Sequence, residues 1–406
     1  MQTTHIVLYC NHFLKFAVCD NLLSYFLKLC GERRYMKKIC FITAARSEYG
    51  LLKWLMYDID KSSDFEMQLI VTGGHLLKEQ GNTINNIRDD GFNIDAVVDA
   101  DLDTSSTEEI ANSMGRLASK LSIAFKELKP DYLVVLGDRY ELLPICSTAF
   151  IMGIPIVHIS GGDVTEGAID DGVRNAITML ATYHFPETSE SANNIRRMRG
   201  NDKNIWVTGN LGLDSFNREE LMSRESLAEN LGLDINSKWI LMTYHSETKK
   251  SIDYNLDALE NCLNVLQKLD GYQVVITYAN ADFGGKDINE FIVKAAEKYP
   301  EKFIVIPSLG HLRYLSYMKQ AVLVVGNSSS GICEAPFLKT PVVNIGDRQK
   351  GRYQCCNIFQ CATDYESIEN CVFNALEQNI EGEDSFYWGD GHTAEKISNI
   401  LSDIIK

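Results

Sequence analysis

From Met36 to about residue 345, short apolar runs alternate with longer segments whose apolar residues recur at helical spacing. Strands and helices that alternate in this way are typical of parallel sheets with crossover helices. Several of the short runs are almost continuously apolar, as expected for strands that are buried on both faces. The pattern therefore predicts an α/β protein.

The predicted strands fall into two series, separated by a charged stretch at 217–226. The first series comprises 39–44, 65–72, 94–99, 132–136, 154–159, 183–185 and 205–208, and the second comprises 239–243, 273–277, 303–306, 321–325 and 341–345. We expect two doubly wound, Rossmann-like domains at 36–210 and 211–385, with a hinge near 209–215. They would face a central cleft at the carboxyl ends of their strands, where ligands bind in this architecture. A C-terminal helix within 386–406 follows, and the pattern does not decide on which half it packs.

The first 35 residues precede this pattern and form a separate problem. Residues 13–30 look apolar, but Lys15, Asp20 and Lys28 interrupt them, whereas a membrane-spanning helix needs about 20 predominantly apolar residues. The basic region and the small-residue cleavage site of a signal peptide are also missing. We therefore predict that residues 1–35 are a dispensable extension and that Met36 is a natural start of the fold.

Composition narrows the classes of partner. With 45% hydrophobic and 23% charged residues the chain is an ordinary core-forming sequence. It has 39 Lys and Arg against 55 Asp and Glu, a net charge of −16, which argues against general binding to nucleic acid or to an anionic membrane. The eleven cysteines include no CxxC pair, so reduced thiols and a cytoplasmic location are expected.

Two strand ends in the first half carry candidate chemistry. Arg46 follows the first strand, with Ser47 as the expected helix N-cap, and the free backbone N–H groups of a helix start favour an anion. Gly137, Asp138 and Arg139 follow the fourth strand. An exposed loop arginine and a structural Asp-Arg pair fit the same spacings, so both alternatives remain open.

The densest stretch is 158–174, directly after the fifth strand, and contains Asp163, Glu166, Asp170, Asp171 and Arg174. Clustered carboxylates raise one another's pKa values and suit acid and base catalysis. A Mg²⁺ site is the rival interpretation, but no DxD or EF-hand spacing occurs. The glycines of this stretch indicate that a ligand approaches the backbone closely, and a solvated acidic loop is the remaining structural alternative.

The second half offers a different set of groups. His245 ends its first strand, although a lone histidine in such a place is more often structural than catalytic. In the segment 326–336, Ser329, Ser330 and Gly331 lead from a strand into a helix, where hydroxyls and N–H groups can surround a phosphate. This is not a P-loop, because GxxxxGK[ST] is absent. Glu334, one turn later, is placed to accept hydrogen bonds from a ribose.

Three cations follow the last strand of the second series, namely Arg348, Lys350 and Arg352. Positive charge concentrated in an acidic chain is the strongest physical indication of a phosphorylated ligand.

Taken together, the motifs ARSEYG, VTGGHL, GNTI, VLGDRYE, HISGGDVTEGAIDD, GNSSSGICEAP and NIGDRQKGR, with Arg174 and His245, resemble the hydrolysing UDP-N-acetylglucosamine 2-epimerases of sialic- and legionaminic-acid-type sugar synthesis. The resemblance implies the two-domain GT-B fold. It implies that UDP is eliminated from the nucleotide sugar to give a 2-acetamidoglucal, and that water then adds with inversion at C2. The products are N-acetylmannosamine and UDP. The resemblance also implies no metal or other cofactor, and a homodimer or homotetramer.

Site residues are carried over by position from the same resemblance. The implied catalytic residues are Asp138 and Asp170, with His245 near the diphosphate, and the implied substrate-binding residues are Arg46, His75, Arg139, Arg174, Ser329, Ser330, Gly331, Glu334, Arg348 and Arg352. One departure is Ser160, where many relatives place a glutamate two residues after the histidine of this motif. That change makes Asp163 and Glu166 further catalytic candidates.

Four other functions remain open at this stage. The same reaction on UDP-N,N'-diacetylbacillosamine is the nearest, followed by a non-hydrolysing epimerase and by a GT-B glycosyltransferase, which would need an acceptor. A catalytically inert nucleotide-sugar sensor belongs to a different class. The carboxylates argue against the sensor, because a pure binder gains nothing from acidic groups beside an anionic ligand.

Overall fold

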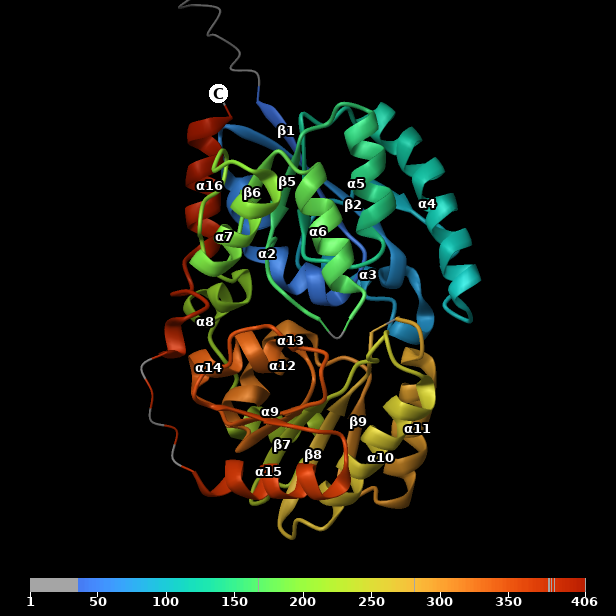
Figure 1. The fold of residues 1–406 in the computed structure, drawn as a ribbon, viewed down its shortest axis with the longest axis vertical. Helices are drawn as coiled ribbons and strands as arrows, with labels where there is room; N and C mark the ends of the chain where they lie inside the picture. The colour runs from blue at the N-terminus through green and yellow to red at the C-terminus, as the bar shows by residue number, and fades with distance from the viewer. Residues whose placement is uncertain are drawn as a thin grey trace, which may run out of the picture. The chain divides into compact units, whose positions relative to one another are not determined.

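The computed structural model describes residues 36–405 except 167, 281, 379, 381 and 383. The predicted extension at 1–35 lies outside the described residues, so its dispensability stays a prediction. Within the described part, the chain forms two six-stranded sheets, and all neighbouring strands pair in parallel (Figure 1). We call them the N-terminal lobe and the C-terminal lobe, each with its covering helices. The predicted α/β, GT-B-like fold class is confirmed.

The N-terminal lobe has the strand order β3-β2-β1-β4-β5-β6. Its strands are β1 (Lys37–Thr43), β2 (Phe65–Thr72), β3 (Ala96–Val98), β4 (Tyr132–Leu136), β5 (Ile156–Ile159) and β6 (Tyr183–Phe185). The strand order reverses between β1 and β4, and ligands of doubly wound sheets bind at such a switch point. Arg46 follows β1 and Asp138 follows β4, so both residues lie there.

The C-terminal lobe repeats the scheme with the order β12-β11-β10-β7-β8-β9. Its strands are β7 (Lys238–Thr243), β8 (Tyr272–Thr277), β9 (Phe303–Ile306), β10 (Leu323–Gly326), β11 (Val342–Ile345) and β12 (Ile358–Cys361). Here the switch point lies between β7 and β10. His245 and the serines 328–330 follow these two strands.

Helices cover both faces of each sheet, which explains the nearly continuous apolar strands. The helices are α2 (Arg46–Lys61), α3 (Ile84–Asp89), α4 (Thr107–Leu128), α5 (Leu142–Ile151), α6 (Asp170–Leu180), α7 (Ser189–Arg199), α8 (Asp214–Arg218), α9 (Arg224–Leu231), α10 (Ile252–Gln267), α11 (Gly285–Lys298), α12 (Gly310–Gln320), α13 (Ser329–Cys333), α14 (Ala335–Leu338), α15 (Tyr365–Glu377) and α16 (Thr393–Ile404). In the N-terminal lobe, one core layer lies under α2 and α16 and another under α4, α5 and α6. None of the described helices is both long and apolar enough to cross a bilayer.

The C-terminal helix α16 returns to the N-terminal lobe, a choice that the sequence pattern left open (Figure 1). Its Ile397 and Leu401 share a buried cluster with Leu52 of α2. The start of α16 is anchored by Asp214, whose carboxylate accepts backbone N–H groups of Thr393 and Ala394 at 2.9 and 2.7 Å. The domain boundaries at 210/211 and 385/386 stay predictions.

Two strand predictions differ from the structure. The run 205–208 is not a strand, because only Ile205 forms an isolated bridge with His184. The strand Ile358–Cys361 was not predicted. It lies at a sheet edge and is mostly half-exposed, so it lacks the strong apolar pattern of a buried strand.

The N-cap prediction at Ser47 is also wrong, since the helix α2 begins at Arg46 with Ala45 as its N-cap. The buried carboxylate of Glu48 replaces a side-chain cap. It accepts the backbone N–H groups of Ala44 and Ala45 at 2.7 and 3.0 Å, as the glutamate of a capping box does.

Candidate active site

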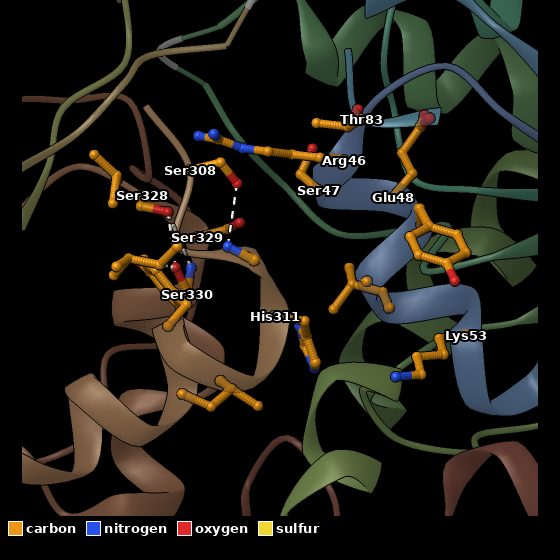
Figure 2. A pocket seen from close by; sticks show the side chains of 18 of the residues that line it. Arg46, Ser47, Glu48, Lys53, Thr83, Ser308, His311, Ser328, Ser329 and Ser330 are labelled. Atoms are coloured by element: carbon orange, nitrogen blue, oxygen red, sulfur yellow. Dashed lines mark hydrogen bonds between the residues drawn. The ribbon is translucent and has the colours of Figure 1, made fainter. Parts of the chain in front are cut away.

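A cavity of about 850 Å³ lies between the carboxyl ends of the two sheets, in the size range of small-molecule sites (Figure 2). The predicted residues that line it are Arg46, Asp138, Arg139, Asp170, His245, Ser329, Ser330, Glu334 and Arg348. Figure 2 shows its two walls, with Arg46 and Glu48 at the start of α2 on one side and the serines 328–330 on the other.

Asp138 is held by a buried guanidinium. Arg174 is completely buried, pairs with the Asp138 carboxylate and donates to the backbone oxygen of Asp163 at 2.8 Å. Burial by itself would raise the pKa of Asp138, but the charges of Arg174, Arg352 and Arg348 outweigh it and lower that pKa. Asp138 is therefore a fixed anion at neutral pH.

The pKa of Asp170, the first residue of α6, is shifted in the opposite direction to that of Asp138. Burial and the nearby negative charge of Asp138 raise the pKa of Asp170 to about 7. The Arg348 guanidinium lies 3.6 Å from its carboxylate and acts against this rise. Two carboxylates whose pKa values move apart within one cavity are suited to acid and base roles.

His245 presents a neutral ring with a defined tautomer. The backbone N–H of Asn280 donates to Nδ1 at 3.2 Å, so the proton of the neutral ring resides on Nε2. Burial and the charges of Arg348, Arg46 and Arg139 lower the pKa of His245 well below its usual value. The ring can therefore donate a hydrogen bond to an anionic group in the cavity.

Two arginines of the N-terminal lobe reach the C-terminal lobe. Arg46 extends toward the serine side of the cavity (Figure 2) and donates to the backbone oxygens of Tyr278, at 3.0 Å, and Pro307. Arg139 donates to both oxygens of Glu141 at 3.0 and 3.1 Å and pairs with Asp282 at 3.2 Å. These cations connect the two walls of the cavity.

The serine wall carries linked hydroxyls. Ser330 Oγ lies 2.9 Å from Ser328 Oγ and 2.8 Å from the Tyr314 hydroxyl, and Ser328 caps the short helix α13. Glu334 ends α13 and is buried, and its pKa is raised to about 7 by that burial. The wall offers hydroxyl donors for a phosphate and an acceptor for a sugar hydroxyl.

Several predicted residues do not line the cavity. They are His75, Asp163, Glu166, Arg174, Gly331 and Arg352. His75 is fully buried between the hydroxyls of Thr43, at 3.0 Å, and Thr83, at 2.8 Å. Burial lowers its pKa to about 4. Thr83 lines the cavity. The neutral His75 ring, which does not, fixes the orientation of the Thr83 hydroxyl through the hydrogen bond between them.

Asp163 of the N-terminal lobe and Arg352 of the C-terminal lobe form an ion pair at 3.3 Å, and both side chains are buried. Asp163 therefore binds the other lobe and does not line the cavity. Glu166 is exposed and lies 3.6 Å from Lys350. A Cβ at Gly331 would lie 3.0 Å from Val342, so this glycine lets α13 pack on its own sheet.

Two of the glycines after β5, Gly161 and Gly162, are explained by packing, and the approach of a ligand to the backbone of this stretch stays a prediction. Gly162 has φ +82°, and a Cβ there would lie 2.2 Å from the backbone oxygen of Ser191. A Cβ at Gly161 would lie 2.8 Å from His158. Both glycines allow the loop to pass closely over neighbouring groups.

Sequence reasoning missed part of the lining, including the segment after β9. Ser308, His311 and Tyr314 line the cavity from the turn and helix that follow β9, and Figure 2 labels Ser308 and His311. His311 Nε2 lies 2.8 Å from Ser215 Oγ. The segment carries no acidic group beside its strand, so it lacked the charge signal used elsewhere. The segment does follow the carboxyl end of a strand, where ligands of this architecture bind, and that signal could have identified it.

We expect Glu48→Gln to make stability less dependent on pH. Burial raises the folded-state pKa of Glu48 to about 8, against roughly 4.3 unfolded. The folded state therefore binds a proton on Glu48 that the unfolded state has released. The stability that this bound proton contributes is lost as pH rises through about 8. Urea unfolding of wild type and Glu48→Gln at pH 5 to 9 measures this, with the exposed Glu127→Gln as control. Equal pH slopes in all three proteins would contradict the buried, protonated state.

Within the described residues, no group of three His, Cys, Asp or Glu side chains is placed to hold a metal ion. The expected lack of a cofactor stays a prediction.

Comparison with known proteins agrees with this geometry. The sequence profile described as UDP-N-acetylglucosamine 2-epimerase matches residues 57–402. A hydrolysing GDP/UDP-N,N'-diacetylbacillosamine 2-epimerase of Campylobacter jejuni is 36% identical, over 79% of this chain and 83% of the relative. A UDP-N,N'-diacetylbacillosamine 2-epimerase of Legionella pneumophila is 30% identical, over 91% and 96%. The crystal structure of Methanocaldococcus jannaschii UDP-GlcNAc 2-epimerase superposes with a TM-score of 0.76 at 19% identity, covering 90% of this chain and 99% of that one.

The two Rossmann-like lobes and their strand-end cavity define a nucleotide-sugar enzyme of GT-B architecture. Within that class, the chain belongs to the UDP-N-acetylglucosamine 2-epimerase family, which confirms the resemblance seen in its motifs.

Proposed function

We propose that the protein is a hydrolysing 2-epimerase that releases UDP from a UDP-linked 2-acetamido sugar. The observation that carries this proposal is the pair Asp138 and Asp170, which share one cavity while their pKa values shift in opposite directions. The opposite wall supplies hydroxyls and cations suited to a diphosphate. Relatives at 36% and 30% identity that are named as hydrolysing epimerases support the same reaction.

In the proposed mechanism, a carboxylate takes the proton from C2 of the sugar while the bond between C1 and the diphosphate oxygen breaks. The electron pair leaves with UDP, and the remaining sugar is a 2-acetamidoglucal. Water then adds its hydroxyl to C1, and a proton returns to C2 on the opposite face. Asp170, with a pKa of about 7, can take the proton from C2 near neutral pH. The proton that returns to C2 comes from a separate donor on the opposite face.

The other groups act by position and charge. Asp138 is an ionised neighbour that sets the pKa of Asp170. His245, protonated on Nε2, and Arg46 stabilise the departing diphosphate as its charge develops. The hydroxyls of Ser329 and Ser330 bind phosphate oxygens, and Glu334 accepts from the ribose.

The sugar is the finer part of the proposal. The sequence analysis placed UDP-N-acetylglucosamine first, with UDP-N,N'-diacetylbacillosamine as the alternative. Two relatives named for diacetylbacillosamine, at 36% and 30% identity, stand beside a Neisseria meningitidis UDP-N-acetylglucosamine 2-epimerase at 29%. We therefore propose the diacetylated sugar as the better substrate of the two.

Incubation of the protein with each nucleotide sugar alone tests both parts. We expect UDP to appear in equal amount to a free 2-epimerised sugar, with kcat/KM at least ~10-fold higher for the diacetylated substrate, the discrimination that one extra hydrogen-bonding group provides. Epimerised sugar still linked to UDP would indicate a non-hydrolysing epimerase. UDP release that requires an added acceptor would indicate a glycosyltransferase, and binding without turnover a sensor.

A further inference from the structure

Helix α5 of the N-terminal lobe is apolar on its outer as well as its inner face. It buries Ile145 and Ala149 in the core of that lobe. On the opposite side, Leu143, Phe150 and Ile151 are 39%, 57% and 83% exposed. Phe150 and Ile151 follow Leu143 by seven and eight residues, a spacing that puts all three on one helix face. A helix that is apolar all round is normally covered on every side, so the outer face of α5 resembles a surface that is buried in an assembly.

Helix α6 lies beside α5 and extends this surface (Figure 1). Both helices bury their inner faces in the same core layer, so their outer faces point the same way. The exposed residues of α6 are Gly172, Ala176 and Met179, which recur at helical spacing, and Met179 is 55% exposed. We call the surface formed by the exposed residues of these two helices the α5–α6 face.

The α5–α6 face carries no charge, although 23% of the chain is charged. No Asp, Glu, Lys or Arg occurs in the segment 142–162, which includes all of α5. The charged residues of α6 are Asp170, Asp171 and Arg174, and all three belong to ion pairs around the cavity. An exposed apolar surface that spans two neighbouring helices marks an interaction site.

The absence of charge favours a second copy of this chain as the partner. Each copy carries a net charge of −16, so two copies repel each other least where they meet through uncharged surface. Around a two-fold axis the same patch meets itself, so a charge near the axis would face its own copy, whereas apolar side chains can pack against themselves. Homodimer interfaces are also more apolar than those of transient complexes between different proteins.

The size of the surface fits a stable dimer. Helix α4 lies beside α5, buries its inner face in the same core layer and adds the small exposed residues Ala111, Gly115 and Ser119. At 1.5 Å per residue and about 10 Å between axes, helices of 22, 10 and 11 residues cover roughly 600 Å² in projection. Each partner of a stable complex buries about 800 Å² of accessible surface, so the three helices can form most of such an interface.

We propose that the protein forms a symmetric homodimer through the α5–α6 face, with α4 at the border of the interface. The inference goes beyond the proposed function and does not depend on it. The same helices reach the cavity, because Asp170 begins α6 and α5 follows Asp138 and Arg139. The partner copy therefore covers the outer side of the helix layer that holds this wall of the cavity.

Sedimentation equilibrium of the full chain measures the mass of the assembly and its Kd. We expect the wild type to have twice the mass of one chain. Ile151→Glu and Met179→Glu each place two carboxylates in the symmetric interface, and each should raise Kd at least ~100-fold. Phe373→Glu is the matched control, because Phe373 is 47% exposed on α15 of the C-terminal lobe, and its Kd should stay within about threefold of wild type. Circular dichroism checks that each variant folds, and if one does not, the other decides because it lies on a different helix.

A monomeric wild type overturns the proposal. So does a folded Ile151→Glu or Met179→Glu dimer whose Kd lies less than about tenfold above that of wild type, or a Phe373→Glu control that dissociates as readily as they do. A monomer that becomes a dimer when residues 1–35 are removed would identify that extension as the cover of the face, and it overturns the proposal as well. A tetramer that both face variants reduce to a dimer supports it, since one kind of interface is lost. If the wild type releases no UDP from either nucleotide sugar, the proposed function fails, and the mass measurement still decides the role of the α5–α6 face.

Discussion

Replacing Asp138 with asparagine is expected to lower kcat at least ~100-fold, or about 2.7 kcal/mol of transition-state stabilisation. Asp138 is the ionised member of the carboxylate pair, and its charge contributes to the raised pKa of Asp170. Asparagine keeps an oxygen that can accept from Arg174 but removes that charge. The pKa of Asp170 should then fall, which makes Asp170 a weaker base toward the C2 proton.

The fold should change little in Asp138→Asn, since the buried Arg174 keeps the backbone oxygen of Asp163 at 2.8 Å and Asp171 at 3.7 Å as partners. Steady-state UDP release and thermal unfolding on the same preparation separate the two effects. Asp99→Asn is the matched control, because Asp99 is exposed just after β3, at the same sheet edge, and does not line the cavity. A rate within tenfold of wild type for Asp138→Asn would remove Asp138 from the mechanism.

The fold could be predicted from the sequence to a large extent, because burial on both faces leaves a direct mark on each strand. Ile39–Thr43 and Trp239–Thr243 are apolar over most of their length and proved to be central strands. The prediction failed where burial is partial. Ile358–Cys361 pairs at an edge, and the run at 205–208 is apolar in places yet forms only one bridge.

Searching the residues that follow each strand found much of the cavity lining. It could not tell which of these residues line the cavity and which are buried beneath its surface. Asp170 and Arg174 lie four residues apart on α6 and hence on one helix face. The structure places Asp170 in the cavity lining and Arg174 completely beneath it. Spacing along the chain carries no information about which charge meets the ligand and which supports it from behind.

A difference in burial also explains why the sequence could not distinguish the roles of Asp163 and Glu166. Both follow β5 within a few residues, yet Asp163 is buried against Arg352 and Glu166 is exposed beside Lys350. The difference is set by which part of the other lobe meets each residue. That information arises from contacts between segments more than 180 positions apart, and no local pattern encodes it.

Replacing Asp170 with asparagine is the second change expected to lower kcat at least ~100-fold, because it removes the base that takes the proton from C2. A base with a pKa of about 7 is ionised only above that pH, so wild-type kcat should rise with pH and level off above about 7. The residual activity of Asp170→Asn should lack this rise. Asp171→Asn, its neighbour outside the cavity lining, is the matched control and should lose less than about tenfold while keeping the rise.

The shape of the pH profile distinguishes a catalytic role from a structural one. A variant that merely loosens α6 would lower kcat at all pH values and leave the midpoint near 7 in place. Loss of the midpoint in Asp170→Asn alone assigns the titration to that carboxyl, whereas a surviving midpoint transfers it to another group of the cavity with a pKa of about 7, and Glu334 is such a group. Because the two carboxyls lie in different lobes, Glu334→Gln then identifies which lobe supplies the proton.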